Sequence, residues 1–176
     1  VRLPMMVLTA GTDSFDEIID NGLEPGIPNI YSLKVLCEVL DRRGVTDFPV
    51  HIKLDTGMHR LGFMTSEIPE LIAFLKDCHN VRVKSIYSHL AASDDPSCDE
   101  FTVSQAEMFK ANADVISDAI GYKPLYHLLT EFRRRIARHK TVGKLRTGKI
   151  QNTFLHQTGI AADRQRVPHF QERIHH

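Results

Sequence analysis

The chain has 176 residues, and 22 Lys+Arg are balanced by 22 Asp+Glu, so its formal net charge is zero. A hydrophobic content of 42% and a charged content of 25% are typical of a soluble globular protein of about one domain. The longest apolar run is far too short to cross a membrane, and no signal peptide opens the chain. Because the first residue is Val1 and not methionine, we expect the chain to begin inside a longer protein.

The charge is unevenly distributed along the chain. Residues 1–129 carry 11 Lys+Arg against 19 Asp+Glu, whereas residues 130–176 carry 11 Lys+Arg against 3 Asp+Glu. Such an abrupt shift usually marks a boundary between parts of a protein. We therefore predict a folded domain over residues 1–129 and an irregular basic tail over residues 130–176.

The cysteines and histidines give no sign of a metal site or a disulfide framework. Cys37, Cys78 and Cys98 are odd in number and widely spaced, which predicts free thiols in a reducing cytoplasm. Five of the ten histidines lie in the basic tail, and none has the spacing of paired metal ligands. We expect no bound metal.

The first half of the chain predicts two strands and two helices. An apolar run over residues 4–10 predicts a buried strand, and residues 15–20 predict a short helix. Residues 23–29 are rich in turn formers, which leaves only a brief strand at residues 30–31. Ser32 then caps a second helix, which Gly44 ends.

The pattern continues with a strand at residues 50–54, a helix from Thr65 or Ser66, and a strand at residues 81–90. A long helix over residues 99–120 and a strand over residues 125–129 complete it. In the long helix we expect one set of apolar residues to face the core: Phe101, Met108, Ala111, Val115 and Ala119.

This alternation of strands and helices with short connections predicts an α/β fold with a parallel sheet. Repeats of roughly 30 to 40 residues suit a (β/α)8 barrel or a doubly wound sheet. No glycine-rich phosphate-binding fingerprint follows any of the strands, which favours the barrel. We predict about five of the eight βα units of a TIM-type barrel.

The strand at residues 50–54 has an unusual polar face. Apolar residues at 50, 52 and 54 alternate with His51, Lys53 and Asp55, and Arg60 follows shortly after. In a sheet with one face in water, this is ordinary alternation. In a closed parallel barrel, however, polar side chains at the C-terminal end of a strand point into the mouth and mark an active site.

The segment Lys53-Leu54-Asp55-Thr56-Gly57-Met58-His59-Arg60-Leu61-Gly62 resembles a motif of the alanine racemase family, whose members are barrels that bind pyridoxal 5'-phosphate. A second segment, Tyr87-Ser88-His89-Leu90-Ala91-Ala92-Ser93-Asp94, is similar to the strand-end motif that follows it in this family. The resemblance covers residues 1–129. The amino-acid sequence at residues 58–60 and 99–102 is most similar to a bifunctional type, in which the racemase follows an ATP-dependent muramoyl-peptide ligase.

The resemblance implies roles for three residues. Arg60 would bind the phenolic oxygen of pyridoxal phosphate and lie near the substrate carboxylate, while His89 would lie beside the ring. Lys53 matches a lysine that is carbamylated in many members, where the carbamate holds the arginine in place. The implied activity is the interconversion of L-alanine and D-alanine for peptidoglycan synthesis, by a cytoplasmic homodimer.

The chain also departs from the family pattern. The lysine that binds the cofactor covalently and the tyrosine that acts as the second base have no counterpart here, because the chain matches about the third to the seventh barrel strand. Where the family has an Asn-Ser pair after His127, this chain has Thr130 and Glu131, and a carboxylate would repel a phosphate. We therefore expect the 176-residue chain alone to be inactive. We interpret residues 130–176 as a segment that is not native to a racemase.

Three alternatives remain. The chain could be a non-catalytic barrel that binds pyridoxal phosphate, or another enzyme of this barrel class such as a decarboxylase or aldolase; the segment from Lys53 to Arg60 argues against the latter. The basic run over residues 132–140 could bind nucleic acid. Neither interleaved aromatic residues nor a nucleic-acid motif supports this partner.

Overall fold

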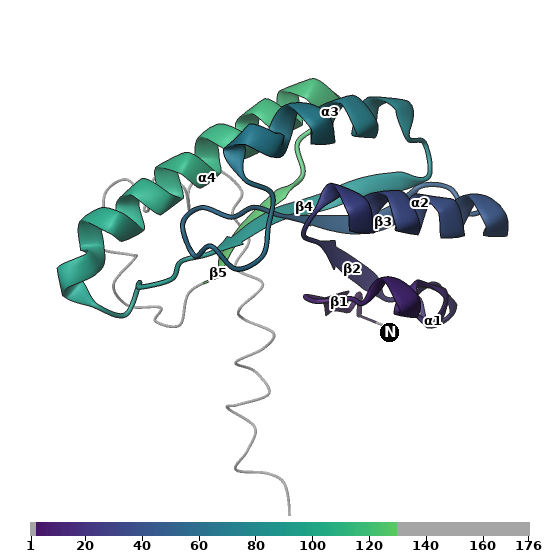
Figure 1. Cartoon of the computed structure of the whole chain (residues 1–176), viewed down its shortest axis with the longest axis horizontal. Helices are drawn as coiled ribbons and strands as arrows, with labels where there is room; N and C mark the ends of the chain where they lie inside the picture. Colours follow the sequence, from purple (N-terminus) through teal and green to yellow (C-terminus); the bar gives the residue numbers. More distant parts are fainter. Residues whose placement is uncertain (1–2, 130–176) are drawn as a thin grey trace, which may run out of the picture.

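Residues 3–129 form five parallel strands joined by helices in the computed structural model, which describes this part of the chain (Figure 1). The strands pair in sequence order, β1-β2-β3-β4-β5, and form half of a barrel. The predicted α/β fold with a partial barrel is confirmed. The elements are β1 (Met6–Val7), α1 (Phe15–Asp20), β2 (Glu24–Ile27), α2 (Ile30–Arg43), β3 (Phe48–Lys53), α3 (Ile68–Asp77), β4 (Val81–His89), α4 (Asp99–Ile120) and β5 (Leu125–Leu129).

The core lies between the sheet and helices α2, α3 and α4, which run along one face of it (Figure 1). Val50, Ile52 and Leu54 are at most 1% exposed and pack in this core, as the alternation of β3 predicted. Side chains at alternate positions of a strand point to opposite faces. The polar residues of β3 therefore lie on the face of the sheet turned away from these helices.

The second strand is not where the sequence predicted it. We expected turns over residues 23–29 and a strand at residues 30–31, but β2 occupies Glu24–Ile27, and Ile30 begins α2. The Asn29 side chain, rather than Ser32, caps this helix and accepts a hydrogen bond of 2.8 Å from the Ser32 backbone N–H. Proline and glycine in β2 had indicated a turn. Gly26 is instead needed in the strand because a Cβ there would collide with the Tyr87 hydroxyl.

The long helix α4 has the predicted bounds but buries a different face. Phe101, Met108 and Val115 are 42%, 43% and 54% exposed, so the prediction that they face the core is wrong. Ala111 is exposed and Ala119 is only partly buried. The buried face consists of Thr102, Gln105, Ala106, Phe109, Asn112, Ala113, Ile116 and Ser117. Polar residues interrupt this stripe, which is why a pattern of apolar residues does not reveal it.

Smaller differences concern where helices begin and end. Thr65 begins a short 3-10 turn, and the α3 helix itself starts at Ile68. Gly44 ends α2 in the left-handed conformation, with a φ of 64°, as predicted. The basic tail predicted for residues 130–176 lies outside the described residues.

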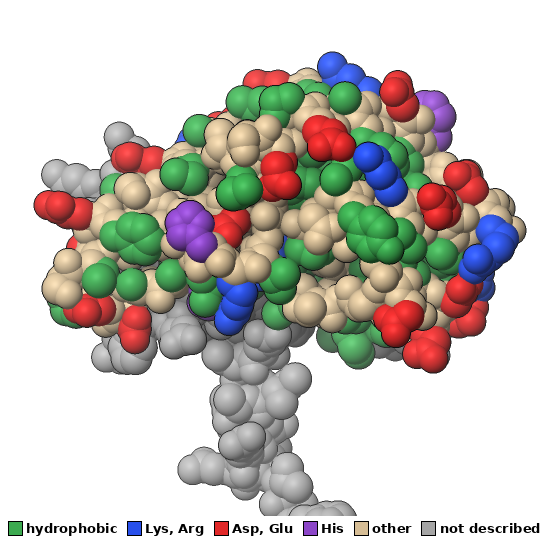
Figure 2. Space-filling model, in the orientation of Figure 1, with side chains coloured by type: hydrophobic (Ala, Val, Ile, Leu, Met, Phe, Trp, Pro, Cys, Tyr) green, Lys and Arg blue, Asp and Glu red, His purple; other side chains and the backbone are tan. Residues whose placement is uncertain are grey.

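Charged side chains are dispersed among hydrophobic ones over the face shown in Figure 2 and do not gather in one basic patch. Among the described residues, no helix combines the length and the apolar character needed to cross a membrane.

Candidate active site at the C-terminal ends of β3 and β4

Lys53 and His89 are the last residues of two neighbouring parallel strands. In the register of the sheet, Lys53 pairs with Tyr87 on β4, and Tyr87 pairs with His127 on β5. Lys53 is 9% exposed, Tyr87 1% and His127 8%, so this row of polar side chains is largely buried. His89 lies two residues beyond Tyr87, at the end of β4. The C-terminal ends of parallel strands are where barrel enzymes carry their active sites.

A tightly wound loop follows β3 and carries Arg60. It returns to the strand through two backbone hydrogen bonds, from the Phe63 N–H to the Lys53 carbonyl at 2.8 Å and from the Asp55 N–H to the Phe63 carbonyl at 2.9 Å. Three loop residues have positive φ: Gly57 at 129°, His59 at 52° and Gly62 at 132°. Glycine adopts such angles without steric cost, which explains the two glycines of the motif.

Asp55 organises the inside of this loop. One of its carboxylate oxygens, Oδ1, accepts hydrogen bonds from the backbone N–H of Gly57 at 2.9 Å and of His59 at 3.1 Å. Burial raises the pKa of the Asp55 carboxyl, but the backbone donors of Gly57 and His59 outweigh it, and the pKa lies below its ordinary value. Asp55 is therefore an ionised carboxylate that shapes the loop.

Arg60 is close enough to Lys53 for its positive charge to act on the Lys53 amine. Burial lowers the pKa of the Lys53 amine, the positive charge of Arg60 lowers it further, and Asp55 partly opposes the shift. Within residues 3–129, neither cation forms an ion pair with a carboxylate. The charge of Arg60, an exposed residue of the loop, thus acts on buried Lys53 at the end of β3, and the Asp55 carboxylate offsets it only in part.

The loops after β3 and β4 are also tied to each other. The Ser88 hydroxyl donates to the Leu54 carbonyl at 2.8 Å, and the Thr56 hydroxyl lies 2.9 Å from Ser88 Oγ. On the other side, the Ala91 N–H donates to Oε1 of Gln105 on α4 at 3.2 Å. These contacts fix the ends of the two strands that carry Lys53 and His89.

Sequence reasoning missed a buried polar cluster below Lys53, formed by Glu24, His51, Ser85 and Lys84. His51 Nε2 lies 2.9 Å from Glu24 Oε2, His51 Nδ1 lies 2.6 Å from Ser85 Oγ, and Lys84 Nζ lies 2.6 Å from Glu24 Oε1. We assign the Nε2–H tautomer to His51, which then donates to Glu24 and accepts from Ser85.

His51 is neutral in this cluster. Burial lowers the pKa of the imidazole, the hydrogen bond and charge of Glu24 oppose this, and the charges of Lys84 and His127 lower it further, so that the pKa lies below its ordinary value. Lys84 already neutralises the Glu24 carboxylate. The sequence showed His51 on the polar face of β3, but its partners depend on an irregularity in the register, where Val50 pairs with Val83 and His51 with Ser85.

The other predictions about the site lie partly outside the described residues. Thr130 and Glu131, which replace an Asn-Ser pair of the family, belong to the part of the chain that is not described. Tyr87 and His127 are further polar residues of the site row, and only their register with Lys53 reveals them.

Comparison with known proteins agrees with the predicted family. The family model described as the alanine racemase N-terminal domain matches residues 1–129. An alanine racemase of Cutibacterium acnes is 30% identical over 129 residues, which are 73% of this chain and 34% of that protein. A structure of the Clostridium difficile alanine racemase in complex with cycloserine is 25% identical with a TM-score of 0.65, over 72% of this chain and 35% of that one.

A Bartonella henselae alanine racemase with covalently bound pyridoxal phosphate has a TM-score of 0.57 at 20% identity, and it supports the fold alone. This match covers 72% of the present chain and 35% of the Bartonella chain. The chain spans only between 21% and 35% of the length of the relatives it matches.

Proposed function

Because the chain belongs to the family of the alanine racemase N-terminal domain, we propose that it forms one wall of the active site of an alanine racemase. The substrate would be alanine, whose L and D forms the enzyme interconverts with pyridoxal phosphate. The observation that carries this proposal is that Lys53 and His89 end the neighbouring strands β3 and β4, while the charge of Arg60, on the loop after β3, acts on Lys53.

The residues at this edge fit an anionic cofactor. Lys53 is largely buried, and the like charge of Arg60 disfavours its protonated form. Neither residue has an ion-pair partner among the described residues. The nearby carboxylate of Asp55 is occupied by two backbone donors. A phenolate or phosphate oxygen placed here would relieve the repulsion between the two cations.

Pyridoxal phosphate, when bound, acts as an electron sink that makes the α-proton of an amino acid acidic. Arg60 would hold the phenolic oxygen of the cofactor and lie near the substrate carboxylate, since a guanidinium is always charged and offers several directed donors. His89 would lie beside the ring. These are binding and orienting roles, and none of these three residues is proposed as the base that moves the α-proton.

Lys53 is proposed to react with CO2 and form a carbamate. The reaction needs a neutral amine, and burial together with the charge of Arg60 lowers the pKa of Lys53 in the required direction. The carbamate would then supply the negative charge that Arg60 lacks in the described structure. Intact mass at neutral pH tests this proposal: an increment of one CO2 on Lys53 is expected, and an unmodified lysine in the protein handled under CO2 would contradict it.

The main test uses the full-length gene product that contains this chain. We expect pyridoxal-phosphate absorbance, D-alanine formation from L-alanine, and a loss of roughly 100-fold in kcat/KM in the variant Arg60→Lys, which removes directed donors. The matched control is Arg82→Lys, because Arg82 lies at the start of β4 and pairs with Asp47 on the surface. Equal activity of Arg60→Lys and the wild type would contradict the proposed role.

Retained cofactor absorbance without racemisation in the same full-length protein would favour the second candidate, a non-catalytic barrel that binds pyridoxal phosphate. For the 176-residue chain alone we propose no racemisation, because Lys53, Arg60 and His89 hold the cofactor without supplying a base. D-alanine production by this purified chain would refute that proposal.

Finer features of the proposal rest on the family resemblance. The amino-acid sequence at residues 58–60 and 99–102 supports a racemase joined to an upstream muramoyl-peptide ligase. The coding sequence upstream of Val1 would test this arrangement. A homodimer that supplies D-alanine to peptidoglycan synthesis in the cytoplasm is part of the same proposal. Nucleic-acid binding through residues 130–176 would instead require salt-dependent binding that is lost when these residues are deleted.

A further inference from the structure

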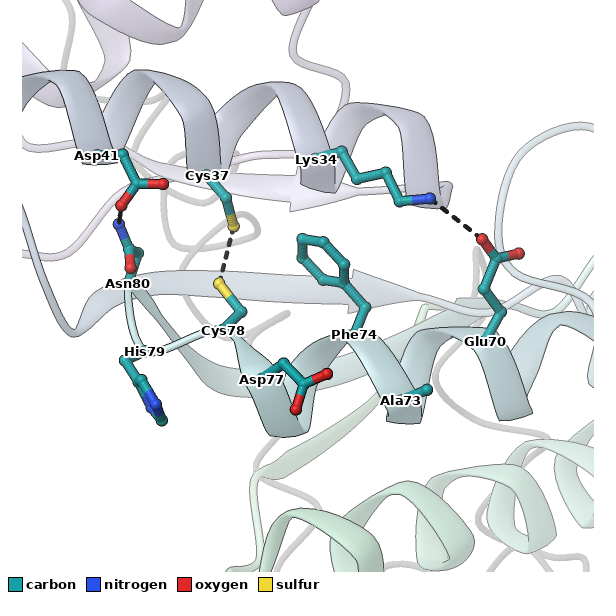
Figure 3. A pocket seen from close by; sticks show the side chains of 10 residues that line it. All are labelled: Lys34, Cys37, Asp41, Glu70, Ala73, Phe74, Asp77, Cys78, His79 and Asn80. Carbon is teal, nitrogen blue, oxygen red and sulfur yellow. Dashed lines mark hydrogen bonds and ion pairs between the residues drawn. The ribbon is translucent and has the colours of Figure 1, made fainter.

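Two cysteines that are 41 positions apart in the chain face each other between α2 and the end of α3 (Figure 3). The Sγ atoms of Cys37 and Cys78 are 3.0 Å apart, although both residues are free thiols. Cys37 lies within α2, and Cys78 is the residue at which α3 ends, where its N–H donates to the Phe74 carbonyl at 3.0 Å. Their spacing in the sequence gave no indication of this pairing.

The pair lies in a groove that is open to solvent. The groove has a volume of about 470 Å³ between α2 and α3, and both thiols line it. Cys37 is 6% exposed, whereas Cys78 is only partly buried. A small reagent can therefore reach Cys78 from the groove, while Cys37 lies behind it.

Two further contacts fix the distance between the helices on either side of the thiols. Lys34 Nζ lies 3.3 Å from Glu70 Oε1 at one end, and Asn80 Nδ2 donates to Asp41 Oδ1 at 2.6 Å at the other (Figure 3). Lys34, Cys37 and Asp41 are spaced by three and four residues, so they lie on one face of α2. The backbone on both sides of the cysteine pair is thus held in place.

We propose that Cys37 and Cys78 form a redox-active pair, which a low-molecular-weight disulfide such as oxidised glutathione converts into an intramolecular disulfide. The thiolate of Cys78 attacks one sulfur of the reagent, forms a mixed disulfide and releases one thiol. Cys37 then gives up its proton and attacks the Cys78 sulfur, which releases the second thiol. Two protein thiols are oxidised, and the reagent is reduced to two thiols.

The surroundings of Cys37 set this order of attack. Burial raises the pKa of the Cys37 thiol, and the hydrogen bond and charge of Cys78 raise it further, with a smaller effect of Asp41. Cys37 therefore stays protonated while Cys78 meets the reagent. Once Cys78 is part of a mixed disulfide, its contribution to the raised pKa of Cys37 is removed, and Cys37 ionises more readily.

The resulting link would enclose part of the candidate site. The segment between Cys37 and Cys78 contains β3 with Lys53 and the loop with Arg60, and the disulfide would join the helices that precede and follow this segment in the chain. A closed loop of this length restricts the unfolded chain. We expect oxidation to raise the thermal unfolding midpoint by several degrees.

Oxidised glutathione added to the folded 176-residue chain tests the proposal. We expect the number of titratable thiols to fall from three to one, the intact mass to fall by two hydrogen atoms, and peptide mapping without reduction to find Cys37 joined to Cys78. Cys98→Ser is the matched control and should form the same link. Cys98 follows the C-terminal end of β4 whereas Cys78 precedes its start, and a nine-residue strand spans roughly 30 Å.

Single variants separate the two steps. In Cys37→Ser, a stable glutathione adduct is expected on Cys78, since nothing resolves it, and the unfolding midpoint should not rise. In Cys78→Ser, the buried Cys37 should react at least tenfold more slowly. Three thiols that remain titratable in the wild type, a link that involves Cys98, or equal reaction rates of the two single variants would overturn the proposal.

Discussion

The substitution Gly62→Ala should destabilise the chain far more than the substitution Gly44→Ala. Gly62 has a φ of 132°, a conformation that L-residues rarely adopt. A Cβ at this position would lie 2.5 Å from the Asp55 backbone nitrogen and 2.6 Å from the Leu54 carbonyl carbon. These neighbours are backbone atoms at the end of β3, so no flexible side chain can move aside.

The loss in unfolding free energy can be estimated from the backbone strain and the hydrogen bonds that the new Cβ would disturb. Holding a non-glycine residue in a sparsely populated conformation costs about 1–3 kcal/mol. Moving the loop away from β3 also weakens the two backbone hydrogen bonds that join Phe63 to Lys53 and Asp55, at about 1 kcal/mol each. We expect the free energy of unfolding to fall by about 3–5 kcal/mol, which is a large part of the stability of a typical domain.

Gly44→Ala is the matched control. Gly44 also has a positive φ, 64°, but a Cβ there would meet nothing within 4 Å. Its replacement should cost about 1–2 kcal/mol, the cost of the left-handed conformation alone. Urea unfolding followed by circular dichroism measures both variants, and hydrogen exchange at the amides of Asp55 and Phe63 reports on the loop. A Gly62→Ala variant within about 1 kcal/mol of Gly44→Ala would refute the reasoning.

Four other substitutions test the burial of particular side chains. Burial lowers the pKa of His51, so the unfolded state binds more protons, and stability should fall as the pH drops below 6.5; His51→Asn should flatten this dependence in urea titrations. Tyr87→Phe, which removes the 3.2 Å hydrogen bond to the Leu8 carbonyl, should cost about 1 kcal/mol in the same assay. Ile116→Ala should lower the free energy of unfolding by about 2–5 kcal/mol and Val115→Ala by under about 0.5 kcal/mol. A larger loss for Val115→Ala than for Ile116→Ala would instead support the face of α4 predicted from the sequence.

The sequence predicted the parts of the fold that depend on local alternation. The apolar residues of β3 alternate strictly, and the strand forms with its apolar face in the core. The motif from Lys53 to Gly62 was likewise recognisable from the sequence, and its two glycines, Gly57 and Gly62, have the positive φ that the turn after β3 requires. Both features lie within a single short segment of the chain.

Features that depend on distant segments were not predictable in this way. The buried face of α4 includes Asn112, whose side chain donates to Thr65 at 2.8 Å, and Gln105, which accepts from Ala91. Asn112 and the side-chain oxygen of Gln105 have partners on other elements, so these polar residues can be buried and break the apolar stripe. Gly26 belongs in a strand because of Tyr87, which lies 61 positions further along.

The polar interior of the half-barrel has two levels with different charge balance. In the lower level, the carboxylate of Glu24 is matched by Lys84, and neutral His51 joins it to Ser85, so each buried polar group has a partner. In the upper level, Lys53 and Arg60 form no ion pair with a carboxylate among the described residues, and the charge of Asp55 offsets that of Arg60 at Lys53 only in part. A protein keeps such an arrangement at a cost in stability, and binding an anion would offset that cost. This contrast in charge balance is the physical reason why an anion is expected to bind at the upper level rather than at the lower one.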